Sequence, residues 1–243
     1  MPIMAQAKNT SASDSKSFVG LHVLLRLSST SLPIGGYSYS QALETAVEEG
    51  RVKDLADLNA WLVSALKTWA KGDSLLWALS YDALCQGNYK RLSSLNSLHW
   101  SSRDTSELRA ETEQMGWSLT QLARDVQWVD SELGSFLKNL EPSTFLTAHV
   151  CTCWSQRIDR HSGLTAFCLA FIDGQVQAAQ KLLPIGQAVA QRLLSNIQSD
   201  IDQCVSDALE SASLGEAAIH TSAPLHSILS ARHEFQYSRL FRS

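Results

Sequence analysis

The sequence lacks any long uninterrupted apolar segment, since no run approaches the roughly 18–20 residues needed to cross a bilayer. Its formal net charge is −4, and no long block carries one sign. Nucleic-acid-binding chains usually carry a basic surplus, so this balance argues against that class. Residues 1–17 contain no apolar signal-peptide core, and their Ser-, Ala- and Lys-rich composition predicts a mobile tail. Neither a membrane nor a nucleic acid is therefore expected as a partner.

Cysteine is scarce, with five residues spread over 243 positions. An odd number at wide spacing does not suit a disulfide framework and favours a reducing, cytoplasmic compartment. Hydrophobic residues make up 44% of the chain and charged residues 18%. That balance is typical of a globular domain rather than a disordered chain.

The common motifs of catalysis and nucleotide binding are also absent. Gly35 and Gly36 lack the Gly-x-x-x-x-Gly-Lys-Ser/Thr spacing of a phosphate-binding loop, and no strand pattern precedes them. No Gly-x-Ser-x-Gly elbow and no His-Glu-x-x-His pair occurs. The sequence therefore predicts no catalytic residue and no cofactor, and a protein that is not an enzyme.

Apolar residues instead recur with helical spacing along most of the chain. A helix is expected from about Asp54 or Asp57, because an acidic side chain near a helix start meets free backbone N–H groups. Asp73 is expected to cap the next helix, which should end near Gly87. The first of these helices has a clear apolar stripe: Leu58, Leu62, Ala65 and Trp69.

The most regular helix is predicted from about Thr105 to Trp128, and Glu107 and Glu111 are assigned to its polar faces. These two like charges lie four residues apart, which carries a small local cost. Gly116 inside this helix costs about 1 kcal/mol relative to alanine. The close approach of another helix is the expected compensation.

The last third of the chain is also predicted to be helical. Pro142 is expected in the first turn of a helix that runs to Ile158, and a short helix is expected over residues 164–172, closed by Asp173-Gly174. Pro184 should interrupt the pattern or start a long helix. No alternating strand pattern of useful length occurs. The expected fold is all-α, a single-domain bundle of roughly eight to ten helices over residues 18–223 with mobile N- and C-terminal tails.

His149, Cys151 and Cys153 form the one cluster that could suggest a metal site. On a helix, His149 and Cys153 share a face whereas Cys151 points elsewhere, and the spacing is not that of a closed zinc site. Free cysteine often behaves as a small buried hydrophobe. Core positions are therefore the favoured interpretation, and no metal ligand is predicted.

Residues 31–40 do not follow the helical pattern and contain Tyr37 and Tyr39. The simple interpretation is that one tyrosine packs in the core and the other is exposed to water. The alternative is a contact surface, since tyrosine buries a large area and keeps a polar group.

Residues 224–243 also differ from the body of the chain, because they are both basic and apolar. Three arginines oppose the single acidic residue Glu234 in a chain that is acidic overall. The arginines and the large apolar residues are Arg232, Arg239, Arg242, Phe235, Tyr237, Leu240 and Phe241. A segment of this kind is expected to lie against a partner surface.

Four stretches, in this order, resemble the urease accessory protein UreF family. They are residues 27–44, with the core Leu-Pro-Ile-Gly-Gly-Tyr-Ser-Tyr-Ser, residues 107–119, residues 183–187 and the C-terminal residues 232–243. Each match alone is weak, but their order along the chain makes the set specific. Residues 139–163 and those before Phe18 contain no comparable match.

The resemblance implies a non-catalytic, all-helical accessory protein of urease maturation. Such a protein pairs with itself and with a UreD-type protein (UreH in some systems), recruits the nickel-carrying GTPase UreG to apo-urease, and helps nickel insertion. Regulation of the GTPase is also implied, and both stimulation and restraint of GTP hydrolysis stay open. A direct nickel carrier, using His149, Cys151, Cys153 or His233, is the alternative function.

The resemblance also places candidate partner contacts in the two unusual segments. By position they are Tyr37, Ser38 and Tyr39 in the first segment and Arg239, Leu240, Phe241 and Arg242 in the second. Phe235 and Tyr237 join them as apolar residues of the same tail. Residues 224–243 are expected to be mobile alone and to order on the UreD-type partner, which requires apolar burial to offset about 1–2 kcal/mol of backbone entropy per residue.

Overall fold

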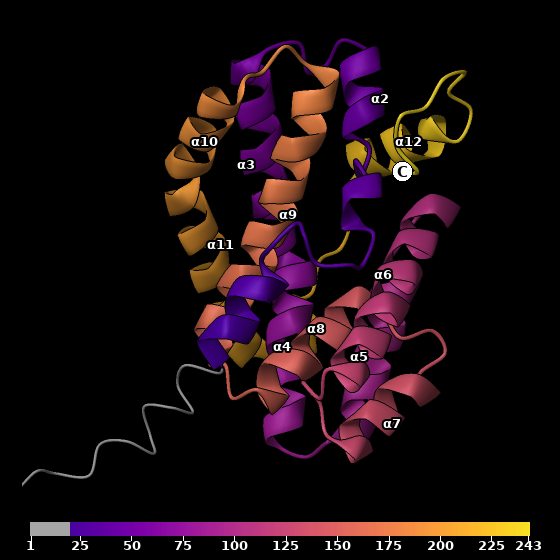
Figure 1. The fold of residues 1–243 in the computed structure, drawn as a ribbon, viewed down its shortest axis with the longest axis vertical. Coiled ribbons are helices and arrows are strands. Elements are labelled where there is room, and N and C mark those ends of the chain that lie inside the picture. The colour runs from indigo at the N-terminus through magenta and orange to yellow at the C-terminus, as the bar shows by residue number, and fades with distance from the viewer. Residues whose placement is uncertain (1–19) are drawn as a thin grey trace, which may run out of the picture.

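The computed structural model describes residues 20–243, and these residues form a bundle of helices (Figure 1). The tail predicted for residues 1–17 lies outside the described residues. A first helix includes residues 20–27. The α-helices that follow are α2 (Leu43–Glu48), α3 (Leu55–Lys71), α4 (Asp73–Cys85), α5 (Tyr89–Ser101), α6 (Ser106–Asp125), α7 (Ser131–Asn139), α8 (Phe145–Ser155), α9 (Arg160–Leu182), α10 (Gln187–Asn196), α11 (Gln198–Ser211) and α12 (Pro224–His233). Two 3-10 segments are η1 (Gly36–Ser38) and η2 (Ala212–Ala218). No strand occurs within residues 20–243, so the all-α prediction is confirmed.

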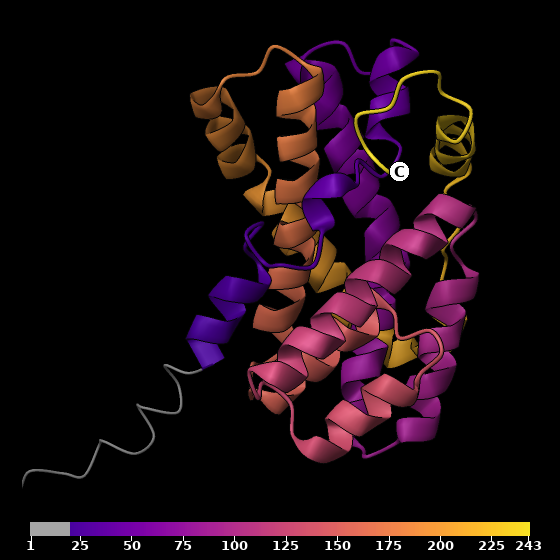
Figure 2. The ribbon, with the colours of Figure 1, turned by 45° about the vertical axis from the view of Figure 1, so that its right-hand side comes forward.

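Helix α4 forms the centre of the bundle, where it packs against α3, α5, α8, α9 and α11 (Figures 1 and 2). Its residues 73–80 are all buried, on every side of the helix. A helix with apolar residues on all sides belongs in a core, because no face of it gains from contact with water. Helices α2 and α12 and the C-terminus lie together at one end of the molecule, above α6.

Two predicted helix starts behave differently in the structure. Asp54 caps α3 as expected, since its side chain accepts hydrogen bonds from the amides of Ala56 and Asp57. The prediction that Asp73 caps α4 is wrong. Its buried carboxylate instead accepts two hydrogen bonds from Arg103, at 3.0 and 2.6 Å. A charged partner in a buried site holds the carboxylate more strongly than the amides of a helix start do.

Gly116 lies where α6 crosses the start of α8. A Cβ atom at this position would lie 2.1 Å from the carbonyl oxygen of Ser143 and 2.7 Å from the amide nitrogen of Phe145. Only glycine lets the two backbones approach this closely. The predicted close approach at Gly116 is therefore confirmed.

Two predicted helix boundaries are wrong. Pro142 precedes α8, which starts at Phe145 with Thr144 as its cap, and the Pro142 carbonyl accepts a hydrogen bond from Asn96 at 2.8 Å. Asp173-Gly174 does not end a helix, because α9 continues to Leu182. Buried residues on both sides of Gly174 hold α9 together, and this packing outweighs the weak helix propensity of glycine. Pro184 does interrupt the pattern, since it lies between α9 and α10.

None of the helices in the described part of the chain is long and apolar enough to span a membrane.

Candidate partner-binding surface

The two segments that stand out in the sequence meet in the structure. The amide of Arg242 donates to the carbonyl of Ser38 at 2.8 Å, and the amide of Ser40 donates to the carbonyl of Ser243 at 2.7 Å. The Ser40 hydroxyl donates to the same Ser243 oxygen at 2.5 Å. After α12 the chain thus turns back and runs along the turn that precedes α2 (Figure 2).

Glu44, in the first turn of α2, holds the C-terminal residues in place. Its side chain is buried, and its two oxygens accept hydrogen bonds from the amides of Leu240 and Phe241, at 2.6 and 3.0 Å. An ionised carboxylate that accepts from two backbone amides makes strong, charge-assisted hydrogen bonds. Sequence patterns gave no reason to single out Glu44, because a glutamate in a first helical turn is ordinary.

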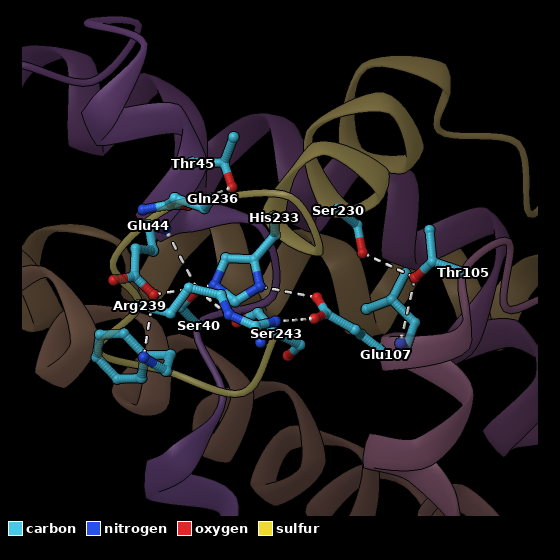
Figure 3. A network of polar contacts seen from close by, with 12 residues as sticks. Ser40, Glu44, Thr45, Thr105, Glu107, Ser230, His233, Gln236, Arg239 and Ser243 are labelled. Atoms are coloured by element: carbon cyan, nitrogen blue, oxygen red, sulfur yellow. Dashed lines mark hydrogen bonds and ion pairs between the residues drawn. The ribbon is translucent and has the colours of Figure 1, made fainter.

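Residues 38–40 and 239–243 together form a junction, and helix α6 forms its other side (Figure 3). Glu107 accepts a hydrogen bond from Arg239 at 2.8 Å, and Glu111 accepts one from the Ser243 hydroxyl at 2.9 Å. Glu107 and Glu111 thus lie off the apolar stripe of α6, as predicted, but they bind the C-terminal segment. The C-terminal segment contacts both residues, and burial of the Glu111 carboxyl raises its pKa to about 7.

His233, the last residue of α12, joins α2 to α6. Its Nε2 atom lies 2.9 Å from Glu44 Oε2, and its Nδ1 atom lies 2.8 Å from Glu107 Oε2 (Figure 3). The imidazole is completely buried. One histidine thus contacts both carboxylates that hold the C-terminal segment.

The candidate contact residues divide into exposed and buried groups. Phe235 is 85% exposed, Leu240 is 62% exposed and Tyr237 projects fully into water. Phe241 is buried in its own chain, with Lys181 Nζ 4.9 Å from its ring centre. Residues 224–243 therefore make ordered contacts with their own chain, and the idea that a partner orders them stays a prediction.

The two tyrosines of the first segment also differ in exposure. Tyr37 is 63% exposed, whereas Tyr39 is buried next to the C-terminal residues. Burial raises the pKa of Tyr39, and the nearby Glu111 carboxylate raises it further. One tyrosine is in the core and one in water, which matches the simple interpretation, and a contact role for Tyr37 stays a prediction.

Two of the three arginines of the tail bind acids of this chain. Arg239 pairs with Glu107, and Arg232 pairs with Glu49 at 2.7 Å on the surface. Arg242 is exposed. Exposed pairs of this kind add little stability, so they orient the segment more than they hold it.

Two cavities adjoin beneath the junction, with volumes of about 330 and 120 Å³. Both are lined by Gln41, Asp73, Arg103 and Glu111. The carboxylate of Asp73 is paired with Arg103, which holds its pKa well below the usual range despite burial. This buried polar wall supports the turn on which the C-terminal residues rest.

Comparison with known proteins agrees with the sequence motifs. The family model for UreF matches residues 52–198. The chain belongs to the UreF family. The urease accessory protein UreF of Polynucleobacter asymbioticus is 42% identical over 90% of this chain and 96% of its own length. UreF of Ralstonia pickettii is 39% identical over 92% and 97%.

A further relative is the bifunctional urease accessory protein UreEF of Bordetella bronchiseptica, 40% identical over 100% of this chain and 57% of its own length. UreF family membership makes this chain an accessory protein of urease. The family match over residues 52–198 covers most helices of the bundle, including α6, whereas the two segments joined at the junction lie on either side of it.

In this UreF family member, the His149–Cys153 cluster lies in the core, as predicted. The indole N–H of Trp77 donates to His149 Nδ1 at 3.1 Å, and the Cys153 sulfur lies 3.6 Å from the same nitrogen. Burial raises the pKa of both Cys151 and Cys153, so the thiols stay protonated. Within residues 20–243, no group of three or more His, Cys, Asp or Glu side chains could hold a metal ion.

Proposed function

We propose that this protein is a non-catalytic scaffold of urease maturation. With a UreD/UreH-type protein it recruits the nickel-carrying GTPase UreG to apo-urease and thereby helps nickel insertion. The supporting observation is the junction, where residues 38–40 and 239–243 form one surface although they come from opposite ends of the chain. Membership of the UreF family supports the place in urease maturation.

The UreD-type partner would bind the exposed side of the junction. Phe235, Tyr237 and Leu240 present apolar and aromatic area there, next to the charged Arg239 and Arg242. Aromatic and arginine side chains contribute strongly when a protein interface buries them. The arginines would set the orientation of the partner more than its affinity.

The remaining candidate residues have two roles in this proposal. They are Tyr37, Ser38, Tyr39 and Phe241. Ser38 and the buried Tyr39 and Phe241 hold the two segments together, whereas the exposed Tyr37 completes the contact surface. The assembled surface would then face the GTPase and favour one of its nucleotide states. The protein would act in the cytoplasm, as a homodimer of the protein or of its heterodimer.

The relative named bifunctional UreEF is consistent with this placement. That relative is named a bifunctional urease accessory protein, and this chain matches 57% of its length.

Co-expression with the UreD-type protein of the same host tests the proposal. The complex would be measured by size-exclusion chromatography with light scattering and by titration of the purified proteins. The double variant Phe235→Ala/Tyr237→Ala should weaken binding at least about tenfold, because two exposed aromatic anchors are lost. Its circular dichroism should match that of the parent protein.

Leu214→Ala is the matched control, since Leu214 is 72% exposed but belongs to η2 rather than to the junction. It should bind like the parent protein. Unchanged binding by the double variant would disprove the proposed surface. Absence of any complex with the parent protein would disprove the scaffold itself, and equilibrium dialysis with nickel would then test the carrier alternative.

A further inference from the structure

The imidazole of His233 lies between two carboxylates. Glu44 of α2 faces its Nε2 atom at 2.9 Å, and Glu107 of α6 faces its Nδ1 atom at 2.8 Å (Figure 3). The side chain of His233 has no exposed surface, while Glu44 and Glu107 are 6% and 12% exposed. Water therefore does not screen these contacts effectively.

The number of protons on His233 follows from this geometry. A neutral imidazole has one N–H group, and its other nitrogen is an acceptor. An ionised carboxylate can only accept, so a neutral His233 would place a nitrogen lone pair against a carboxylate oxygen. Only an imidazolium, with two N–H groups, can donate to Glu44 and Glu107 at the same time.

The second proton of this cluster belongs on the imidazole rather than on the carboxylate of Glu44 or Glu107. Glu44 accepts hydrogen bonds from the amides of Leu240 and Phe241, and Glu107 accepts one from Arg239. These donors all favour an ionised oxygen. Two carboxylates opposite one guanidinium would leave a buried negative charge, and a protonated His233 removes that imbalance.

We propose that His233, as an imidazolium, positions the C-terminal segment (residues 234–243) on α2 and α6, and that loss of its proton frees the segment. The link is direct, because the Glu44 oxygen that faces His233 also accepts the Phe241 amide. The charged groups around the imidazole are Glu44 from α2, Glu107 from α6 and Arg239 from the segment itself.

The sign of the effect follows from the charge. The protonated histidine makes both contacts, so the segment is held while the imidazole keeps both protons and is released when one is lost. Histidine is the side chain whose charge ordinarily changes near neutral pH. The effect of this release on partner binding rests on the proposed function, because the released segment would change the surface offered to the UreD-type partner.

Hydrogen exchange of the Leu240 and Phe241 amides, in the full-length protein alone, tests the idea. Protection relative to the intrinsic exchange rate should fall at least about tenfold between about pH 6 and about pH 9. Nitrogen-15 NMR of the imidazole should show protons on both ring nitrogens at the lower pH. A single ring proton there, or constant protection across the range, would overturn the proposal.

Glu107→Gln is the decisive variant. Its side-chain amide can donate to a neutral His233 Nδ1, while its carbonyl still accepts from Arg239. The segment should therefore stay protected across the whole pH range. His233→Gln should instead lower protection at every pH, because no cation remains. A pH step that persists unchanged in Glu107→Gln would refute the role of His233.

Glu111→Gln is the control for the other group that titrates near neutral pH at this junction. In this variant the protection of the Leu240 and Phe241 amides should still fall as pH rises, because residue 111 does not contact His233. None of these measurements involves the partner. Loss of partner binding with an intact pH step would therefore reject the proposed function alone.

Discussion

Two histidines of this chain are completely buried, and their neighbours are opposite in character. His149 lies among aromatic rings in the core, where Phe145 and Phe167 pack edge-on against it and the Trp77 indole donates to its Nδ1 atom. Burial lowers its pKa to about 3, so it is neutral at physiological pH. His233 lies between the carboxylates of Glu44 and Glu107.

The comparison shows that burial alone does not decide what a histidine does. In the core, no anion compensates a proton, and the neutral ring serves as an acceptor for Trp77. At the junction, two carboxylates can be satisfied together only by a ring that donates twice. The same residue type therefore packs as a neutral ring in one region and bridges two carboxylates in the other.

The largest expected effect tests the neutral state of His149. The unfolded histidine takes up a proton below about pH 6.5, whereas the folded one does not until about pH 3. The free energy of unfolding should therefore fall as pH falls through this window, by about 5 kcal/mol over its whole extent. Urea titrations at several pH values would measure the loss.

His149→Phe isolates this contribution. It should cost about 1–3 kcal/mol at neutral pH, because the buried Trp77 N–H loses its acceptor. Its acid-induced loss should be smaller than that of the parent protein. Parallel pH profiles for the two proteins would show that His149 is not the neutral core group described here.

The next-largest effect tests whether a change in the packing of α6 in the core also disturbs the junction. Gly116→Ala should lower the free energy of unfolding by more than about 3 kcal/mol, because its Cβ atom would meet backbone atoms at the start of α8. Helix α6 would have to move, and it carries Glu107 and Glu111. Protection of the Leu240 amide should therefore fall as well.

Gly174→Ala is the matched control within a helix. Nothing lies within 4 Å of the added Cβ atom, so alanine should stabilise α9 by up to about 1 kcal/mol. Urea titration of both variants measures the contrast. Equal stability of Gly116→Ala and the parent protein would contradict the close contact between α6 and α8.

A third effect has the opposite pH slope. Desolvation raises the pKa of Glu111 from 4.5 to about 7, so the folded protein holds this proton where the unfolded chain has lost it. Between about pH 4.5 and pH 7, this group should make the protein less stable as pH rises, by about 3 kcal/mol. Glu111→Gln removes this pH-dependent contribution, so the stability of the variant relative to the parent protein should be higher at pH 7 than at pH 4.5. A Glu111→Gln profile parallel to that of the parent would contradict the assignment.

The smallest effect concerns the exposed side of the junction. Tyr237→Ala should change the free energy of unfolding by no more than about 0.5 kcal/mol, because the side chain projects fully into water. Phe241→Ala should cost about 3 kcal/mol, since that ring is buried. Thermal and urea unfolding of the pair would separate the surface of the junction from its interior.

Much of the fold could be predicted from the sequence because helical packing repeats locally. The apolar stripe of α3, its cap at Asp54 and the close contact at Gly116 all depend on residues a few positions apart or on one small side chain. The errors have a common cause. Asp73 binds an arginine thirty residues away, and α9 continues past Gly174 because distant helices pack around it.

The candidate site was predictable only in outline. Residues 31–40 stood out because they broke the helical pattern, and residues 224–243 because they are both basic and apolar. The structure joins the two segments through Ser40 and Ser243. The acids that hold them together did not stand out. Glu44 and Glu107 look like ordinary surface glutamates of helices, and nothing local marks them as buried.

By itself, the sequence determined the all-α class, the UreF family and the two unusual segments, because periodicity and motif order are local properties of the chain. The tertiary structure decided which charges are buried and which protons they hold. His233 and Glu44 are 189 positions apart, so no spacing rule connects them. The charge state of a buried group depends on its neighbours in space, and only the packing of α2, α6 and α12 supplies those neighbours.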